Sequence, residues 1–166
     1  MASLKIAYAA SSGLTVTNLH SIATSATWVA GWESGAIDNT TDLYADYLVT
    51  AKIALGNAAT AGEIRVYIVG MNDDAEWPDV FDGTESVETI TTTTIRDGIC
   101  KLGAAVPTRA DPGTDDVYWL GPFSVASLFG GVCPHKFVVF ITHSTGVNLA
   151  ASGNEVNIKG VYYTVA

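Results

Sequence analysis

The stretch DLYADYLVTAKIAL, residues 42–55, decides the fold. Its apolar residues recur at every second position, and the turn pair Gly56-Asn57 ends the pattern. A period of two is typical of a β-strand that turns one face to a core and the other to solvent. The stretch therefore predicts a long, half-buried strand.

Four further strands are predicted towards the C-terminus. Residues 64–69 alternate in the same way between two glycines, and residues 117–120 follow a turn-rich segment. Residues 136–143 are apolar on both faces, which predicts a central strand. Residues 156–165 are β-branched and aromatic, so we expect them to pair deep in the fold and to be intolerant of truncation.

The remaining segments set the fold class. Residues 95–102 and 124–129 each fit either a short strand or a helical turn, and no helical pattern of 10–15 residues separates the strands. Residues 1–41 have only weak periodicity. The sequence thus predicts an all-β protein, with an irregular N-terminal arm with short strands (1–41) before an antiparallel β-sandwich or jelly roll (42–166).

Composition indicates one folded domain. The chain has 166 residues, of which 48% are hydrophobic and 15% charged, far from the composition of disordered proteins. Its longest bulky apolar run, residues 137–141, is much shorter than the roughly 20 residues of a membrane span. Residues 1–8 lack the apolar run of a signal peptide. We expect an unprocessed protein that is made in a cytoplasm and has no membrane partner.

The charge distribution argues against nucleic acid as a partner. Seventeen Asp and Glu face eight Lys and Arg, which gives a net charge of −9, and the cations are scattered singly along the chain. Binding to a phosphate backbone requires a clustered positive surface that releases counterions. The sequence therefore predicts no binding of DNA or RNA.

The sequence lacks the spaced motifs that are typical of catalytic and cofactor sites. The chain has no GxxxxGK[ST], GxGxxG or GxSxG motif, its histidines are far apart, and its cysteines form no CxxC. We predict no catalytic residue, no cofactor and no metal site. Cys100 and Cys133 are expected to be buried free thiols that would pair only in an oxidising environment. Of the histidines, His143 at the end of the predicted central strand merits inspection.

The acidic loop, residues 71–88, is the longest predicted loop. It carries seven carboxylates around Trp77, an indole on which a sugar could stack. We favour a solvated loop over a calcium site, a carbohydrate contact or a catalytic carboxylate pair, because neither an EF-hand order nor a fixed carboxylate separation is present. Two further tryptophans fit either a core or an interface. The candidate partner contacts are Trp28, Trp32, Trp77, Asp79 and Asp82.

Several segments resemble uncharacterised virion structural proteins of tailed bacteriophages. The likeness covers most of the chain after residue 28 and rests on WVAGWES (28–34) with Asp38-Asn39, WPDVFDG (77–83), GPFSVASLFGG (121–131), THSTG (142–146) and GVYYT (160–164). Small β-sandwich proteins of such particles are commonly decoration, or cement, proteins of the outer capsid shell. The resemblance implies that role, with the major capsid protein as partner and the virion's outer surface as location.

The leading hypothesis is therefore a structural protein that stabilises contacts between capsid subunits, with the N-terminal arm reaching a neighbour. An acidic exterior is compatible with it, since a protein next to packaged DNA would be repelled. We expect a homotrimer, because closed cyclic assemblies cover sheet edges and apolar patches. The runner-up is a carbohydrate- or receptor-binding module of a phage fibre or spike, and a glycosidase is a third, less favoured class.

Overall fold

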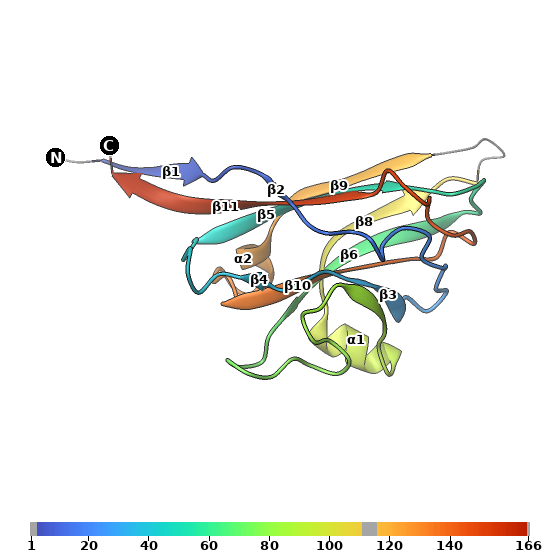
Figure 1. Ribbon diagram of the computed structural model, residues 1–166, viewed down its shortest axis with the longest axis horizontal. Coiled ribbons are helices and arrows are strands. Elements are labelled where there is room, and N and C mark those ends of the chain that lie inside the picture. The colour runs from blue at the N-terminus through green and yellow to red at the C-terminus, as the bar shows by residue number, and fades with distance from the viewer. Residues whose placement is uncertain (1–2, 111–115, 166) are drawn as a thin grey trace.

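The computed structural model describes residues 3–110 and 116–165 and contains two antiparallel β-sheets that pack face to face (Figure 1). Strands hold 46% of the residues and helices 7%, so the predicted all-β class is confirmed. Within the described residues, no helix has the length and apolar character that crossing a membrane requires.

Sheet A has the strand order β1-β11-β5-β9, and β2 also pairs with β11. Its strands are β1 (Leu4–Tyr8), β2 (Ser12–Gly13), β5 (Asp46–Ala54), β9 (Val117–Ser124) and β11 (Glu155–Val165). The strand predicted over 42–55 is β5, whose side chains alternate between buried and half-buried as period two requires. The predicted strand at 117–120 is the first half of β9.

Sheet B has the order β7-β3-β10-β6-β8, and β4 pairs with β10. Its strands are β3 (Ala30–Glu33), β4 (Ile37–Asp38), β6 (Gly62–Gly70), β7 (Ser86–Thr89), β8 (Lys101–Thr108) and β10 (Lys136–His143). The prediction of a central strand at 136–143 is confirmed, because β10 lies in the middle of the sheet and is buried from Phe137 onward.

Two short helices resolve the segments left open by the sequence. Helix α1 (Thr93–Ile99) begins where the Thr92 hydroxyl accepts a hydrogen bond from the Ile95 N–H, and β8 follows it directly. Helix α2 (Val125–Leu128) begins at Ser124, which caps it in the same way through the Ser127 N–H. Residues 95–102 are thus part helix and part strand, and residues 124–129 contain a helical turn.

Strand β10 contributes to two apolar cores. Phe137, Val139 and Ile141 point between the sheets and join the main core. Val138 and Phe140 point to the opposite face of sheet B, where a second core lies. This second core also contains Phe81 from the acidic loop and Ile90, and the partly buried Ile95 and Ile99 of α1 pack against it. Burial on both faces explains why β10 has a continuous apolar sequence.

The predicted boundary at residue 41 differs from the structure. Trp32 and Glu33 of β3 pair with Ile141 and Phe140 of β10, so residues 30–38 belong to the sandwich. Only β1 stands away from the body, where it pairs with the end of β11 (Figure 1). Strands of two to four residues are too short for alternation to be visible in the sequence.

Candidate functional site

The clearest exposed feature is the terminal ribbon, which consists of β1 and residues 161–165 of β11. Its strands pair in the register Leu4 with Val165, Ile6 with Tyr163 and Tyr8 with Val161. Beyond Val161, β11 has left β5, so the described part of the ribbon has two strands only. The expectation that residues 156–165 pair deep in the fold is therefore correct at Val156 and wrong for the last four described residues.

One face of the ribbon is entirely apolar. Side chains of register partners lie on the same face, and alternate residues of a strand share a face. The face defined in this way, the apolar stripe, consists of Leu4, Ile6, Tyr8, Val161, Tyr163 and Val165. Five of these side chains are more than half exposed, from 58% at Tyr8 to 69% at Val165. Contiguous exposure of this kind is typical of an interaction surface.

The opposite face of the ribbon is anchored to the body at its base. Tyr162 lies on this face, with its ring centre 5.9 Å from that of Tyr44. The Tyr44 ring lies over Gly160, where a Cβ would stand 2.3 Å from a ring carbon. Gly160 is thus required for the close approach that holds the base of the ribbon.

A second exposed apolar surface lies on β9, at the other end of sheet A. Asp46, the first residue of β5, pairs with Val161, whereas Ala54, the last, pairs with Val117. Next to Val117 on the same face, Trp119 is 70% exposed. We call Val117 and Trp119 the β9 patch. Two apolar surfaces therefore lie at opposite ends of β5.

The position of Trp119 is fixed by a row of three side chains across sheet A. Lys52 of β5 pairs with Trp119 on one side and with Glu155 of β11 on the other. The Lys52 ammonium lies 5.8 Å from the centre of the indole and 2.7 Å from a Glu155 carboxylate oxygen. The sequence analysis did not single out Trp119. Alternation along β9 nevertheless puts it on the other face of the sheet from Leu120, which is buried.

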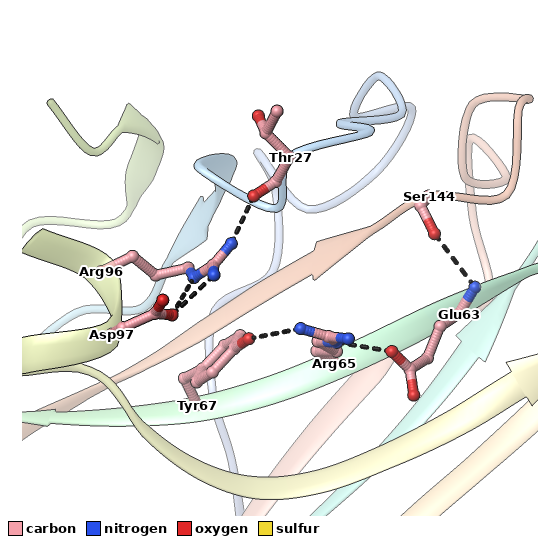
Figure 2. A network of polar contacts seen from close by, with 7 residues as sticks. All are labelled: Thr27, Glu63, Arg65, Tyr67, Arg96, Asp97 and Ser144. Atoms are coloured by element: carbon pink, nitrogen blue, oxygen red, sulfur yellow. Dashed lines mark hydrogen bonds and ion pairs between the residues drawn. The ribbon is translucent and has the colours of Figure 1, made fainter. Parts of the chain in front are cut away.

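Trp28 and its neighbours form a clamp between a loop and sheet B. Trp28 is half-buried and adopts a φ of 53°, an unusual conformation for a bulky residue. The Arg65 guanidinium lies 3.9 Å from the centre of its ring. The carbonyl oxygen of Thr27 accepts a hydrogen bond from Arg96 of α1 (Figure 2). Trp28 therefore holds the loop before β3 in place and exposes only part of its ring.

Trp32 lies in the main core and presents no surface to a partner. It is fully buried, and its indole N–H donates a hydrogen bond of 2.7 Å to Glu85. Glu85 also accepts hydrogen bonds from the Asn18 main chain and side chain. Trp32 thus joins the acidic loop to the core, and the prediction that it contacts a partner is corrected, because the fold encloses it.

The acidic loop engages its own side chains. The Trp77 ring is half-buried against Gly83. Asp79 accepts hydrogen bonds from the N–H and hydroxyl of Thr91, and Asp82 accepts one from the Thr84 N–H. In the described part of the chain, no group of three or more His, Cys, Asp or Glu side chains is placed to hold a metal ion. Asp79 and Asp82 are thus already engaged in hydrogen bonds within the protein, which is the organisation of a structural loop.

Glu33 is a buried carboxyl beneath this loop. It is fully inaccessible, and one of its oxygens accepts hydrogen bonds from the N–H groups of Gly83, at 2.7 Å, and Asp82, at 3.3 Å. The other oxygen has no hydrogen-bond partner among the described residues. Burial is the main cause that raises the pKa of Glu33 to about 7. The sequence offered no sign of this group, because a single Glu in a four-residue strand resembles a surface residue.

His143 and the cysteines are structural. His143 is fully buried, and its ring nitrogens lie 3.0 Å from the Thr145 hydroxyl and 3.3 Å from the carbonyl oxygen of Ile22. Burial lowers the pKa of this imidazole. Cys100 is buried and Cys133 half-buried, both are free, and burial raises the pKa of each thiol to about 12. Thiols with such pKa values are poor nucleophiles.

A cleft of about 710 Å³ lies between the end of β6, the end of α1 and the loop before β10. Its lining includes Ile99, Phe129, Val132 and His135. The His135 imidazole is already engaged, since its Nε2 lies 3.2 Å from the carbonyl oxygen of Asp73. The cleft is therefore a mostly apolar hollow, and its imidazole is already within hydrogen-bond distance of the protein's own main chain.

The terminal ribbon and the β9 patch thus expose apolar side chains at the two ends of sheet A, and of the five predicted contact residues Trp32 alone is enclosed by the core. The chain matches no protein-family model, no curated protein and no solved structure.

Proposed function

We propose that this protein is a structural component of a virion that binds the outer capsid shell and stabilises contacts between shell subunits, without catalytic activity. The observation that carries the proposal is the pair of exposed apolar surfaces, the apolar stripe and the β9 patch, at opposite ends of one sheet. A protein that bridges neighbours needs two separate contact surfaces, and aromatic side chains are enriched in such contacts.

The β9 patch is the surface we assign to the shell. Trp119 is the type of residue that dominates binding energy when a pocket on a partner buries it. Lys52 restricts the indole from below, so less side-chain freedom is lost on binding. The surrounding row of Lys52 and Glu155 supplies a polar rim that can pair with charges of a shell subunit.

Binding to assembled particles tests the proposal. The purified protein is mixed with shells that lack it, and the amount that sediments with them gives the affinity and the copy number relative to the major capsid protein. We expect Trp119→Ser to weaken binding at least about tenfold, as the loss of a central aromatic contact does. Lys159→Ser, on the same outward face of sheet A near the middle of β11, is the matched control and should bind as the parent does.

The assignment would be abandoned if the protein did not bind any shell, or if Trp119→Ser and Lys159→Ser bound equally well. Circular dichroism of both variants checks that the fold is retained. Because Trp119 is exposed, its replacement is not expected to disturb the core.

A carbohydrate- or receptor-binding module remains the runner-up, and we propose Trp119 in place of Trp77 as its stacking residue. Trp77 packs against Gly83, whereas Trp119 presents its ring to solvent, as stacking on a sugar requires. Glycan-array binding that is lost in Trp119→Ser and retained in Trp77→Phe would favour this function. Hydrolysis of a glycan that is lost in Asp79→Asn or Asp82→Asn would instead indicate an enzyme.

A further inference from the structure

The apolar stripe has no partner within the described chain. Leu4, Ile6 and Tyr8 from β1 are exposed at 58–66%, and Tyr163 and Val165 from β11 at 60–69%. An isolated two-stranded ribbon is marginally stable in water, because neither of its faces is fully covered. A ribbon with a continuous apolar face therefore gains most when another surface covers that face.

The charge distribution favours a second copy of this chain as the surface that covers the apolar stripe. The chain as a whole carries −9, so copies of it repel one another over most of their surfaces. The terminal ribbon is an exception, since residues 4–8 and 161–165 contain one cation, Lys5, and no carboxylate side chain. Lys5 lies on the opposite face from the stripe, beside Thr164. Two copies can therefore meet stripe to stripe without bringing carboxylates of the ribbons together.

We propose that the apolar stripe is the site where copies of this chain associate, ribbon against ribbon, around a closed symmetry axis. The inference rests on the proposed function, because a cyclic oligomer gives an assembly protein one shell-binding patch for each subunit. In a trimer, three stripes would face the threefold axis, and in a dimer two would stack as a small sandwich. The Lys5 face would stay in solvent in both.

The composition of the stripe suits contact with itself. The middle rung, Ile6 with Tyr163, combines an aliphatic and an aromatic side chain, and so does the rung of Tyr8 with Val161. Aromatic rings packed against branched aliphatic side chains are favourable pairs on β-surfaces. Five stripe side chains are more than half exposed, so burying them would supply part of the roughly 800 Å² per partner of a stable interface. Contacts between the neighbouring bodies would supply the remainder.

Two threonine substitutions test the proposal, because threonine keeps a high strand propensity. Ile6→Thr removes an apolar side chain from the stripe, and Lys5→Thr makes the matched change on the opposite face of the same strand. Sedimentation velocity and light scattering from about 1 to 100 µM give the mass of the parent and of each variant. We expect a parent mass of two or three times 17.4 kDa. Ile6→Thr should raise the dissociation constant at least about tenfold, and Lys5→Thr less than about twofold.

The proposal would be overturned by a parent that is monomeric over this range, or by an oligomer that Ile6→Thr and Lys5→Thr weaken equally. These measurements contain no shells, so they are independent of the proposed function. An oligomer that binds no shell would refute the shell role and leave the ribbon contact intact. A monomer that binds shells and loses this binding in Ile6→Thr would show that the shell covers the stripe instead.

Discussion

The guanidinium of Arg65 lies 3.9 Å from the centre of the Trp28 ring. The same guanidinium donates hydrogen bonds to Glu63, at 2.5 Å, and to the Tyr67 hydroxyl, at 3.2 Å (Figure 2). A planar cation that is bonded along its edge and stacked through its face is held in one orientation. Through it, the loop before β3 is fixed to β6 of sheet B.

The first prediction concerns this stack. Arg65→Lys should lower the free energy of unfolding by about 1 kcal/mol, because an ammonium cannot stack and form the two edge bonds together. Urea denaturation followed by tryptophan fluorescence measures the change. Lys101→Arg, at the exposed start of β8, is the control and should change stability by less than about 0.5 kcal/mol. An Arg65→Lys variant as stable as the parent would show that the stack contributes nothing.

A second prediction follows from the buried Glu33 carboxyl. Its pKa of about 7 in the folded protein exceeds its ordinary value of 4.5, so the folded state holds the proton more tightly. This contribution to stability is fully present below pH 4.5 and is lost as the pH rises towards and through 7.

Glu33→Gln removes this ionisation and keeps an oxygen acceptor for the Gly83 N–H. It should therefore be more stable than the parent at pH 8, by on the order of 2 kcal/mol, with a smaller difference at pH 5. Urea denaturation at the two pH values measures this, and Glu76→Gln at an exposed position is the control. A difference that does not depend on pH would contradict the prediction.

His143 gives the opposite pH dependence. Burial lowers its pKa below 6.5, so the unfolded chain takes up a proton that the folded chain resists. Its contribution to stability is present above pH 6.5 and is lost as the pH falls below that value. In an NMR titration, the His143 ring signals should therefore stay constant until the pH has fallen below 6.5. A His143 ring that titrates at pH 6.5 or above would refute this.

Two tryptophans provide a matched pair for the core. Trp32→Phe loses the hydrogen bond to Glu85 and leaves a cavity, so it should lower the free energy of unfolding by about 2–3 kcal/mol. Trp119→Phe, at a 70% exposed position, should change it by less than about 0.5 kcal/mol. Thermal or urea unfolding of both variants gives the comparison. Equal effects would mean that the two residues do not differ in burial.

The prediction that nucleic acid is no partner can now be stated in terms of ion pairs. Among the described residues, Lys52, Arg65, Arg96 and Lys136 each pair with a carboxylate. Cations that are neutralised in this way release few counterions from a phosphate backbone. We expect no gel shift with DNA or RNA even at low salt. A shift that weakens as salt is added would refute the prediction.

Period-two alternation predicted β5 and β6, and a continuous apolar run predicted β10, because all three strands are long enough to show a pattern. It did not locate β3, whose four residues are too few for a pattern, and whose Trp32 is buried by pairing with a strand more than a hundred residues away. Helix α1 was left open because contacts distant in sequence, such as that of Arg96 with Thr27, help to hold it in place.

The terminal ribbon shows a different limit. Residues 161–165 have the composition of a core strand, so the sequence predicted burial. What decides their exposure is the length of the partner strands, since β5 begins at Asp46 and pairs with β11 only up to Val161. No local pattern reports where a neighbouring strand starts. Contacts between residues distant in sequence, not composition, therefore decide that Trp119 and Tyr163 are exposed and that Trp32 is buried.

Leu4 and Val165 face each other across the terminal ribbon, so both described ends of the chain emerge at one tip (Figure 1). A peptide or fluorescent protein fused to either end would be presented from that same point, away from the sandwich. If the ribbons gather about an axis, such fusions would be clustered, and weak binders would gain avidity from a raised effective concentration. The ribbon would then make this fold a scaffold for multivalent display.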